Sequence, residues 1–180
     1  MKHCPSDTRL QVIFNTVERH IESRYGIPVI IKDVPTPFTG DLDGAEIHVD
    51  YDLSMADAVF ILVHLFGHTV QWNADLTARE VGMRDYTDAD DTALAELQRY
   101  EVTACRYSMQ LFHEAGVDDC DLWLSDFAAC DFAYLDHFYR TGVKRPFMSF
   151  WQDDQTRMTP LAIPAFVPTK WETRWDGVVI

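Results

Sequence analysis

Hydrophobic residues follow one another along the chain in blocks with helical spacing, separated by turns that contain Gly, Pro or Asp. Near the start, Ser6 or Asp7 is a suitable cap for a helix that we predict to run to about Arg24 and to end at Gly26. Its apolar residues recur at intervals of three and four, which is typical of an amphipathic helix packed on a core. They are Leu10, Ile13, Phe14, Val17 and Ile21.

A second helix, predicted from Met55 to about Trp72 with Ser54 as its cap, is hydrophobic on nearly every side. A helix of this kind is usually buried, so we expect it at the centre of the fold. A polar loop follows over residues 75–92, and two further helices are predicted over about 91–115 and 119–140.

Short strands are predicted between the first two helices. Residues 27–31 form an apolar run between Gly26 and a Pro-rich turn, and residues 45–49 alternate apolar with polar side chains. The pattern predicts an α+β fold with a mainly helical core and a small β-sheet. We expect one domain over residues 1–180, with the core at 1–142 and an extended, aromatic and Pro-rich arm at 143–180.

The charge and the cysteines narrow the class of protein. A formal net charge of −14 repels phosphate backbones and anionic lipid headgroups, so we expect neither a nucleic-acid nor a membrane partner. The four cysteines form no CxxC pair and are too few for a disulfide scaffold, so they are interpreted as reduced thiols. With no apolar run near 20 residues, we expect a cytoplasmic protein.

The feature that indicates chemistry is the pair His64 and His68 on the apolar central helix. Residues four apart on a helix lie about 40° apart around its axis and about 6 Å apart along it, so both imidazoles can reach one divalent ion. A buried imidazole without a partner costs about 1 to 3 kcal/mol, which a bound metal offsets. The alternative is two core histidines satisfied by ordinary hydrogen bonds.

The segment Val63-His64-Leu65-Phe66-Gly67-His68 resembles the HExxH helix of zincin (gluzincin) metallopeptidases, in particular that of the ImmA/IrrE-like family. The later segment with Glu101, Ala104, Tyr107 and Ser108 is similar to that family's glutamate helix, and the order of elements agrees. The resemblance implies a zincin-like fold with the sheet over the metal cleft. It implies Zn²⁺ held by His64, His68 and Glu101, with water as the fourth ligand.

Leu65 departs from the family's pattern, because it stands where the catalytic glutamate follows the first histidine. Loss of a general base typically forfeits a factor of about 10² to 10⁴ in rate, although that glutamate is not a ligand. Three interpretations stay open. The chain is a hydrolase-like metalloenzyme with another base, a non-hydrolytic metalloenzyme with Fe²⁺ or another divalent metal, or an inactive pseudo-peptidase that binds or regulates a partner.

Seven further residues are candidates for the site. Three lie on the helix over 91–115 and are candidate catalytic bases besides Glu101: Glu96, Tyr107 and His113. Four others are candidates for contacts to the ligands or the substrate: Gln71 and Cys105 from helical spacing, His48 from its strand, and Asp131 from its apolar neighbours.

The substrate class stays open among peptides, proteins and small molecules. The arm either covers its own chain or joins two copies in a homodimer. For the pseudo-peptidase interpretation, Trp151, Trp171 and Trp175 on the arm are candidate anchors for a protein partner.

Overall fold

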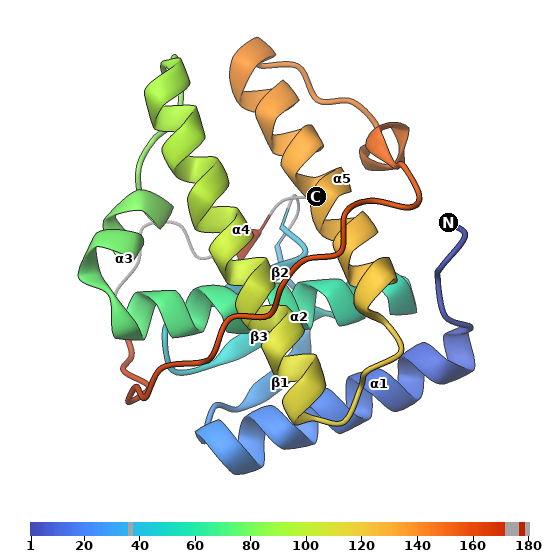
Figure 1. Ribbon diagram of the computed structural model, residues 1–180. Coiled ribbons are helices and arrows are strands. Elements are labelled where there is room, and N and C mark those ends of the chain that lie inside the picture. Colours follow the sequence, from blue (N-terminus) through green and yellow to red (C-terminus); the bar gives the residue numbers. More distant parts are fainter. Residues whose placement is uncertain (36–37, 172–176, 179–180) are drawn as a thin grey trace.

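A computed structural model describes residues 1–35, 38–171 and 177–178 (Figure 1). The fold is α+β, as the pattern predicts. The helices are α1 (Asp7–His20), continued by one π-helical turn (Ile21–Tyr25), then α2 (Met55–Ala74), α3 (Leu76–Gly82), α4 (Asp91–Glu114) and α5 (Asp121–Thr141), with a 3-10 turn at Phe147–Phe150. In the part of the chain described, no helix is long and apolar enough to cross a membrane.

The sheet is small and lies against α2. Its strands are β1 (Val29–Lys32), β2 (Gly40–Leu42), β3 (Ile47–Asp50) and the two-residue β4 (Gly177–Val178), in the order β1-β3-β2-β4. β1 pairs parallel with β3, while β2 pairs antiparallel with β3 and with β4. Ile47 and Val49 are buried, and side chains alternate across a strand, so His48 points to the outer face of the sheet.

α2 is the central element, as its apolar sequence predicts. The Ser54 side chain caps it by accepting a hydrogen bond from the backbone N–H of Asp57, and the residues from Ala58 to Trp72 are all buried. α1, the sheet and α4 all pack on it. In Figure 1, α4 and α5 cross one side of α2 next to each other.

One short helix was not expected. Residues 76–82, in the predicted polar loop, form α3, which begins where the Asp75 side chain accepts a hydrogen bond from the backbone N–H of Thr77. Only Val81 in this helix is buried, so the sequence carries almost no apolar periodicity there. The local cap and the packing of α3 on α2 and α4 determine it instead.

The arm lies on its own chain. Beyond Gly142 it crosses α5 and α4 (Figure 1), where the backbone N–H of Met158 donates to Ser125 Oγ and that of Leu161 donates to the carbonyl of Arg106. It then reaches the end of α2, where the Trp171 ring stacks on Trp72. Trp175 lies outside the described residues. A homodimer through the arm stays a prediction.

Candidate metal centre

α2 and α4 come into direct backbone contact beside the two histidines. A Cβ atom added to Gly67 would lie 2.3 Å from the carbonyl oxygen of Ala104, so only glycine permits this approach. One turn further along α4, the Ser108 hydroxyl donates to the carbonyl of Val63 at 2.7 Å. Gly67 on α2 and Ser108 on α4 thus allow the two helices to pack closely, with Glu101 of α4 facing α2.

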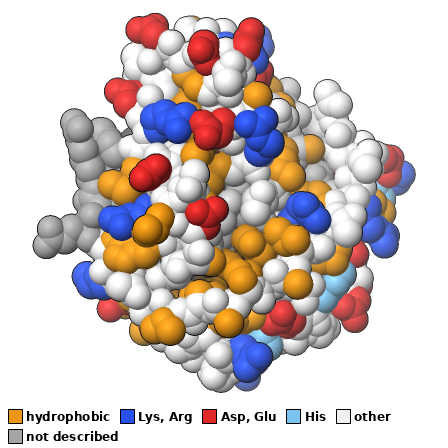
Figure 2. All heavy atoms as spheres, turned by 60° about the vertical axis from the view of Figure 1, so that its left-hand side comes forward, with side chains coloured by type: hydrophobic (Ala, Val, Ile, Leu, Met, Phe, Trp, Pro, Cys, Tyr) orange, Lys and Arg blue, Asp and Glu red, His pale blue; other side chains and the backbone are white. Residues whose placement is uncertain are grey.

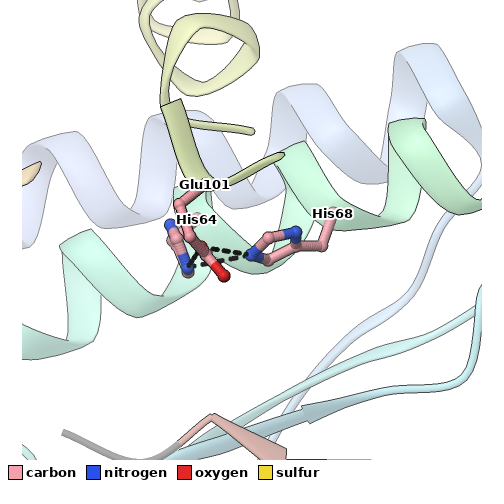
Figure 3. A group of neighbouring side chains, drawn as sticks. All are labelled: His64, His68 and Glu101. Atoms are coloured by element: carbon pink, nitrogen blue, oxygen red, sulfur yellow. Dashed lines mark hydrogen bonds and ion pairs between the residues drawn. The ribbon is translucent and has the colours of Figure 1, made fainter. Parts of the chain in front are cut away.

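Three buried side chains converge at this contact. Figure 3 shows the Glu101 carboxylate, from α4, reaching the imidazoles of His64 and His68 on α2. His64 Nε2 and His68 Nε2 are 3.0 Å apart, and Glu101 Oε2 lies 3.1 Å from His68 Nε2 and 3.3 Å from His64 Nε2. The residues are 2%, 5% and 8% exposed, so water contributes little to satisfying them.

The triangle of ligand atoms matches the dimensions of a metal site. Tetrahedral coordination with bonds of about 2.0 Å places ligand atoms about 3.3 Å apart. Adjacent positions of an octahedron with bonds of about 2.1 Å are about 3.0 Å apart. The distances of 3.0 to 3.3 Å fall between these limits. His64, His68 and Glu101 are therefore a buried group able to hold a metal ion, and their spacing does not distinguish zinc from iron.

Gln71 orients the imidazole of His68. Its Nε2 donates to the backbone carbonyl of Tyr100 at 2.8 Å, which turns its Oε1 toward His68 Nδ1 at 2.9 Å. An amide oxygen only accepts, so His68 carries a proton on Nδ1, and Nε2 is the nitrogen that faces Glu101 and His64 and would bind a metal in place of its own proton. Helical spacing had placed Gln71 on this stripe of α2, and the structure brings it to His68.

Two other candidates lie beside His64. Cys105 Sγ is 3.5 Å from His64 Nδ1, the ring nitrogen that faces away from Glu101. Burial raises the pKa of this thiol well above its usual value, as do the charges of Asp131 and Glu101, so it remains a neutral thiol. Asp131 on α5 is buried as well: burial raises its pKa to about 7, although the charge of His64 opposes the rise.

Glu101 supplies the negative charge of the site. Burial alone would raise the pKa of this carboxyl, but the charge of His68 and hydrogen bonds from both histidines outweigh burial and lower the pKa to about 2. Glu101 is thus an anion at any physiological pH. Two imidazoles and one fixed anion suit a divalent cation.

Two aromatic rings that we did not assign to the site pack on the ligands. The Phe60 ring stacks on His64 with centroids 5.2 Å apart, and the Tyr100 ring stacks on His68 at 4.6 Å. Burial raises the pKa of Tyr100 well above its usual value, so its phenol stays neutral. The positions carried a weak signal, since Phe60 lies one turn before His64 and Tyr100 directly precedes Glu101.

Leu65 packs under the sheet. It is fully buried, and a Cβ atom added to Gly40 of β2 would come within 2.7 Å of both Leu65 Cδ1 and Ile61 Cγ2. The sheet therefore packs on the side of α2 that carries Ile61 and Leu65, while α4 packs at the histidines. The expected position of the sheet over the metal cleft stays a prediction.

The three candidate bases have other partners or surroundings in the structure. Glu96 is ion-paired with Arg84 at 2.5 Å, and Glu96 and Tyr107 line a cavity of about 280 Å³ between α2, α3 and α4. His113 lies twelve residues after Glu101 on α4, about 18 Å along the helix axis, and pairs with Asp121 at 2.9 Å. His113 is therefore too far away to act at the centre.

The prediction that His48 lies near the metal site is wrong. Its ring nitrogens each lie 3.3 Å from a carboxylate oxygen, one of Asp41 and one of Glu46, on the outer face of the sheet. The strand's alternation turns it away from α2, so it does not lie over the metal site.

Comparisons of the chain with protein-family models, with curated proteins and with solved structures gave no match. The resemblance to zincins therefore rests on the two segments that carry it. The candidate metal centre rests on the geometry of His64, His68 and Glu101.

Proposed function

We propose that the protein binds one divalent metal ion through His64, His68 and Glu101 and is a metal-dependent enzyme with at least one open coordination position. The supporting observation is the triangle of three ligand atoms, 3.0 to 3.3 Å on a side, within a buried region. Three protein ligands leave room for water or a substrate, which is typical of catalytic rather than structural zinc sites.

Of the reaction classes, hydrolase-like chemistry related to the zincin metallopeptidases is the first candidate. Zn²⁺ in such a site would polarise a substrate carbonyl and lower the pKa of bound water toward 7. Because Leu65 lies under β2, the base cannot come from that position as it does in HExxH enzymes. Asp131 is the buried carboxylate coupled to the ligands, and we propose it as a positioning residue for His64.

A second candidate is non-hydrolytic chemistry with Fe²⁺, because two histidines and one carboxylate are also the ligand set of non-haem iron oxygenases. One observation favours it. The aromatic rings of Phe60 and Tyr100 pack directly on the two histidine ligands. The three candidate bases have partners or positions of their own: Glu96, Tyr107 and His113. This apolar environment of the ligands suits a reaction that needs no general base at residue 65.

Metal analysis of the purified protein tests the proposal. We expect about one zinc or iron ion per chain in the wild type and none in His64→Ala. The matched control is His137→Ala, which removes a histidine from α5 that packs on Phe150. Loss of metal in the control as well, or an absence of metal from a folded wild type, would contradict the metal centre.

Separate loading with zinc and ferrous iron then distinguishes the reaction classes. Hydrolysis of peptide or ester substrates by the zinc form would support hydrolase-like chemistry, and oxygen consumption by the ferrous form would support the second candidate. A protein that binds metal stoichiometrically and does neither would support the pseudo-peptidase.

A further inference from the structure

A small hydrophobic pocket between α4 and α5 borders Glu101, one of the three candidate metal ligands. Its volume is about 20 Å³, and Glu101 is one of its lining residues. Its apolar walls come from Leu94 and Leu97 on α4 and from Phe132, Leu135 and Tyr139 on α5. Figure 1 shows the two helices side by side.

Glu101 has the most exposed side chain of the three candidate ligands. Its side chain is 11% exposed, against 3% and 6% for the side chains of His64 and His68. The same carboxylate lines the α4–α5 pocket. Of the cavities described, this pocket is the one in which a metal ligand forms part of the wall.

The larger cavity, between α2, α3 and α4, does not reach the ligand atoms. Gln71 and Tyr100 line it, and these two residues stand between it and His68, on the Nδ1 side and on the ring face. Charged residues of both signs also line it, and Figure 2 brings forward this side of the molecule, where charged side chains of both signs gather toward one end. A molecule in this cavity would meet the back of His68 rather than the ion.

The dimensions of the α4–α5 pocket limit what passes through it. A cavity of about 20 Å³ holds about one water molecule. The exposed residues Gln98 and Asp136 complete the lining. Of its two charged residues, Asp136 is paired with Arg140 and Glu101 with the histidines, so neither is free to pair with a charged reactant. An extended peptide needs a groove several residues long, and a charged molecule would lose its hydration in this pocket without a matching ion pair.

We infer that the reactant reaches the metal centre through the pocket between α4 and α5 and is a small, neutral molecule of a few non-hydrogen atoms rather than a peptide. The inference rests on the metal centre proposed above, whose open coordination position the molecule would occupy. It narrows the substrate class, which the ligand set leaves open.

Cobalt-loaded protein provides a test with a readout that does not depend on activity, because ligand binding to Co²⁺ changes its visible spectrum. The probe is nitric oxide, a neutral diatomic molecule, mixed anaerobically with the protein in a stopped-flow instrument. Leu135→Trp narrows the pocket from α5, where the side chain is half-buried and tolerant of change. We expect it to slow nitric oxide binding by about tenfold or more at unchanged cobalt content.

Leu97→Phe provides a second obstruction from α4, and Leu97→Ala is expected to accelerate binding. The matched control is Ala78→Trp, which fills the cavity lined by Gln71 and is expected to leave the rate unchanged. A peptide hydroxamate, which chelates the ion in open metallopeptidase clefts, is expected to leave the wild-type spectrum unchanged.

Two results would overturn the inference alone: stoichiometric cobalt with rates unaffected by Leu135→Trp and Leu97→Phe, or a wild-type spectrum that responds to the hydroxamate. Slowing by Ala78→Trp would place the entrance at the other cavity and would also overturn it. A folded protein that takes up no cobalt would overturn the metal centre itself and the inference with it.

Discussion

The carboxamide of Gln71 determines which nitrogen of His68 is free to bind a metal. Replacing it in Gln71→Met keeps the volume but removes the acceptor for the Nδ1 proton. We expect metal affinity to fall by about 10- to 100-fold, measured by competition with a chromophoric chelator. Gln110→Met on α4, whose amide pairs with Glu114, is the control. Equal affinities in the two variants would show that Gln71 does not orient the ligand.

Asp131 should make the stability of the metal-free protein depend on pH. Its pKa is raised from 3.8 to about 7 in the folded state, so the folded protein binds more protons than the unfolded chain between these values. The free energy of unfolding should therefore fall as pH rises from about 4 to 7, by up to about 1.4 kcal/mol per pH unit. Asp131→Asn should remove this component.

Urea unfolding at pH 4, 6 and 8 would check this prediction. Asp131→Asn should gain stability relative to the wild type as pH rises, whereas Asp136→Asn, on the exposed side of α5, should not. A constant difference between Asp131→Asn and wild type across this range would show that Asp131 ionises normally.

At the scale of elements, the contact between α2 and α4 depends on Gly67. Alanine normally favours a helix over glycine by about 1 kcal/mol. Here, a Cβ atom would lie 2.3 Å from the carbonyl oxygen of Ala104 and 2.7 Å from its carbonyl carbon, and these backbone atoms cannot turn aside. We expect Gly67→Ala to lower the free energy of unfolding by about 3 kcal/mol and to reduce metal content, because α4 carries Glu101. Stabilisation in urea unfolding would instead reveal free space.

The contact between α2 and β2 determines what happens when Leu65→Glu restores the HExxH sequence. Leu65→Glu would place a carboxylate in the apolar layer beneath Gly40, where its charge has no partner among the contacts described for Leu65. We expect a loss of several kcal/mol in urea unfolding and no gain of peptidase activity. Leu65→Met is the control and should cost less than about 1.5 kcal/mol. A stable Leu65→Glu protein that cleaves casein would show that residue 65 faces the ion.

At the scale of the whole molecule, the arm fastens the ends of α2 and α3 to the rest of the fold. Trp171 stacks on Trp72, lies 4.0 Å below the Arg79 guanidinium, and donates its backbone N–H to the carbonyl of Asp43. Trp171→Ala should cost about 3 kcal/mol and make the arm sensitive to limited proteolysis. Val167→Ala, at an exposed arm position, is the control. Equal resistance of the two variants would show that Trp171 does not anchor the arm.

Much of the secondary structure follows from the sequence because caps and apolar spacing act over a few residues. Ser54 and the apolar run after it predict α2, and the spacing of His64 and His68 places both imidazoles on one side of it. Glu101 was predicted by resemblance, and the structure brings it to the two histidines. α3 was missed because its residues lack an apolar face.

The tertiary structure decided what surrounds the two histidines. The sequence places Leu65 next to His64, but only the packing of Gly40 shows that residue 65 belongs to the sheet side of α2. Helical spacing brought Gln71 close to His68, whereas His48 and His113 are distant because a strand's alternation and a helix's length carry them away. Local propensity depends on neighbours along the chain, but a metal centre depends on contacts between distant segments, and those contacts form only when the core packs.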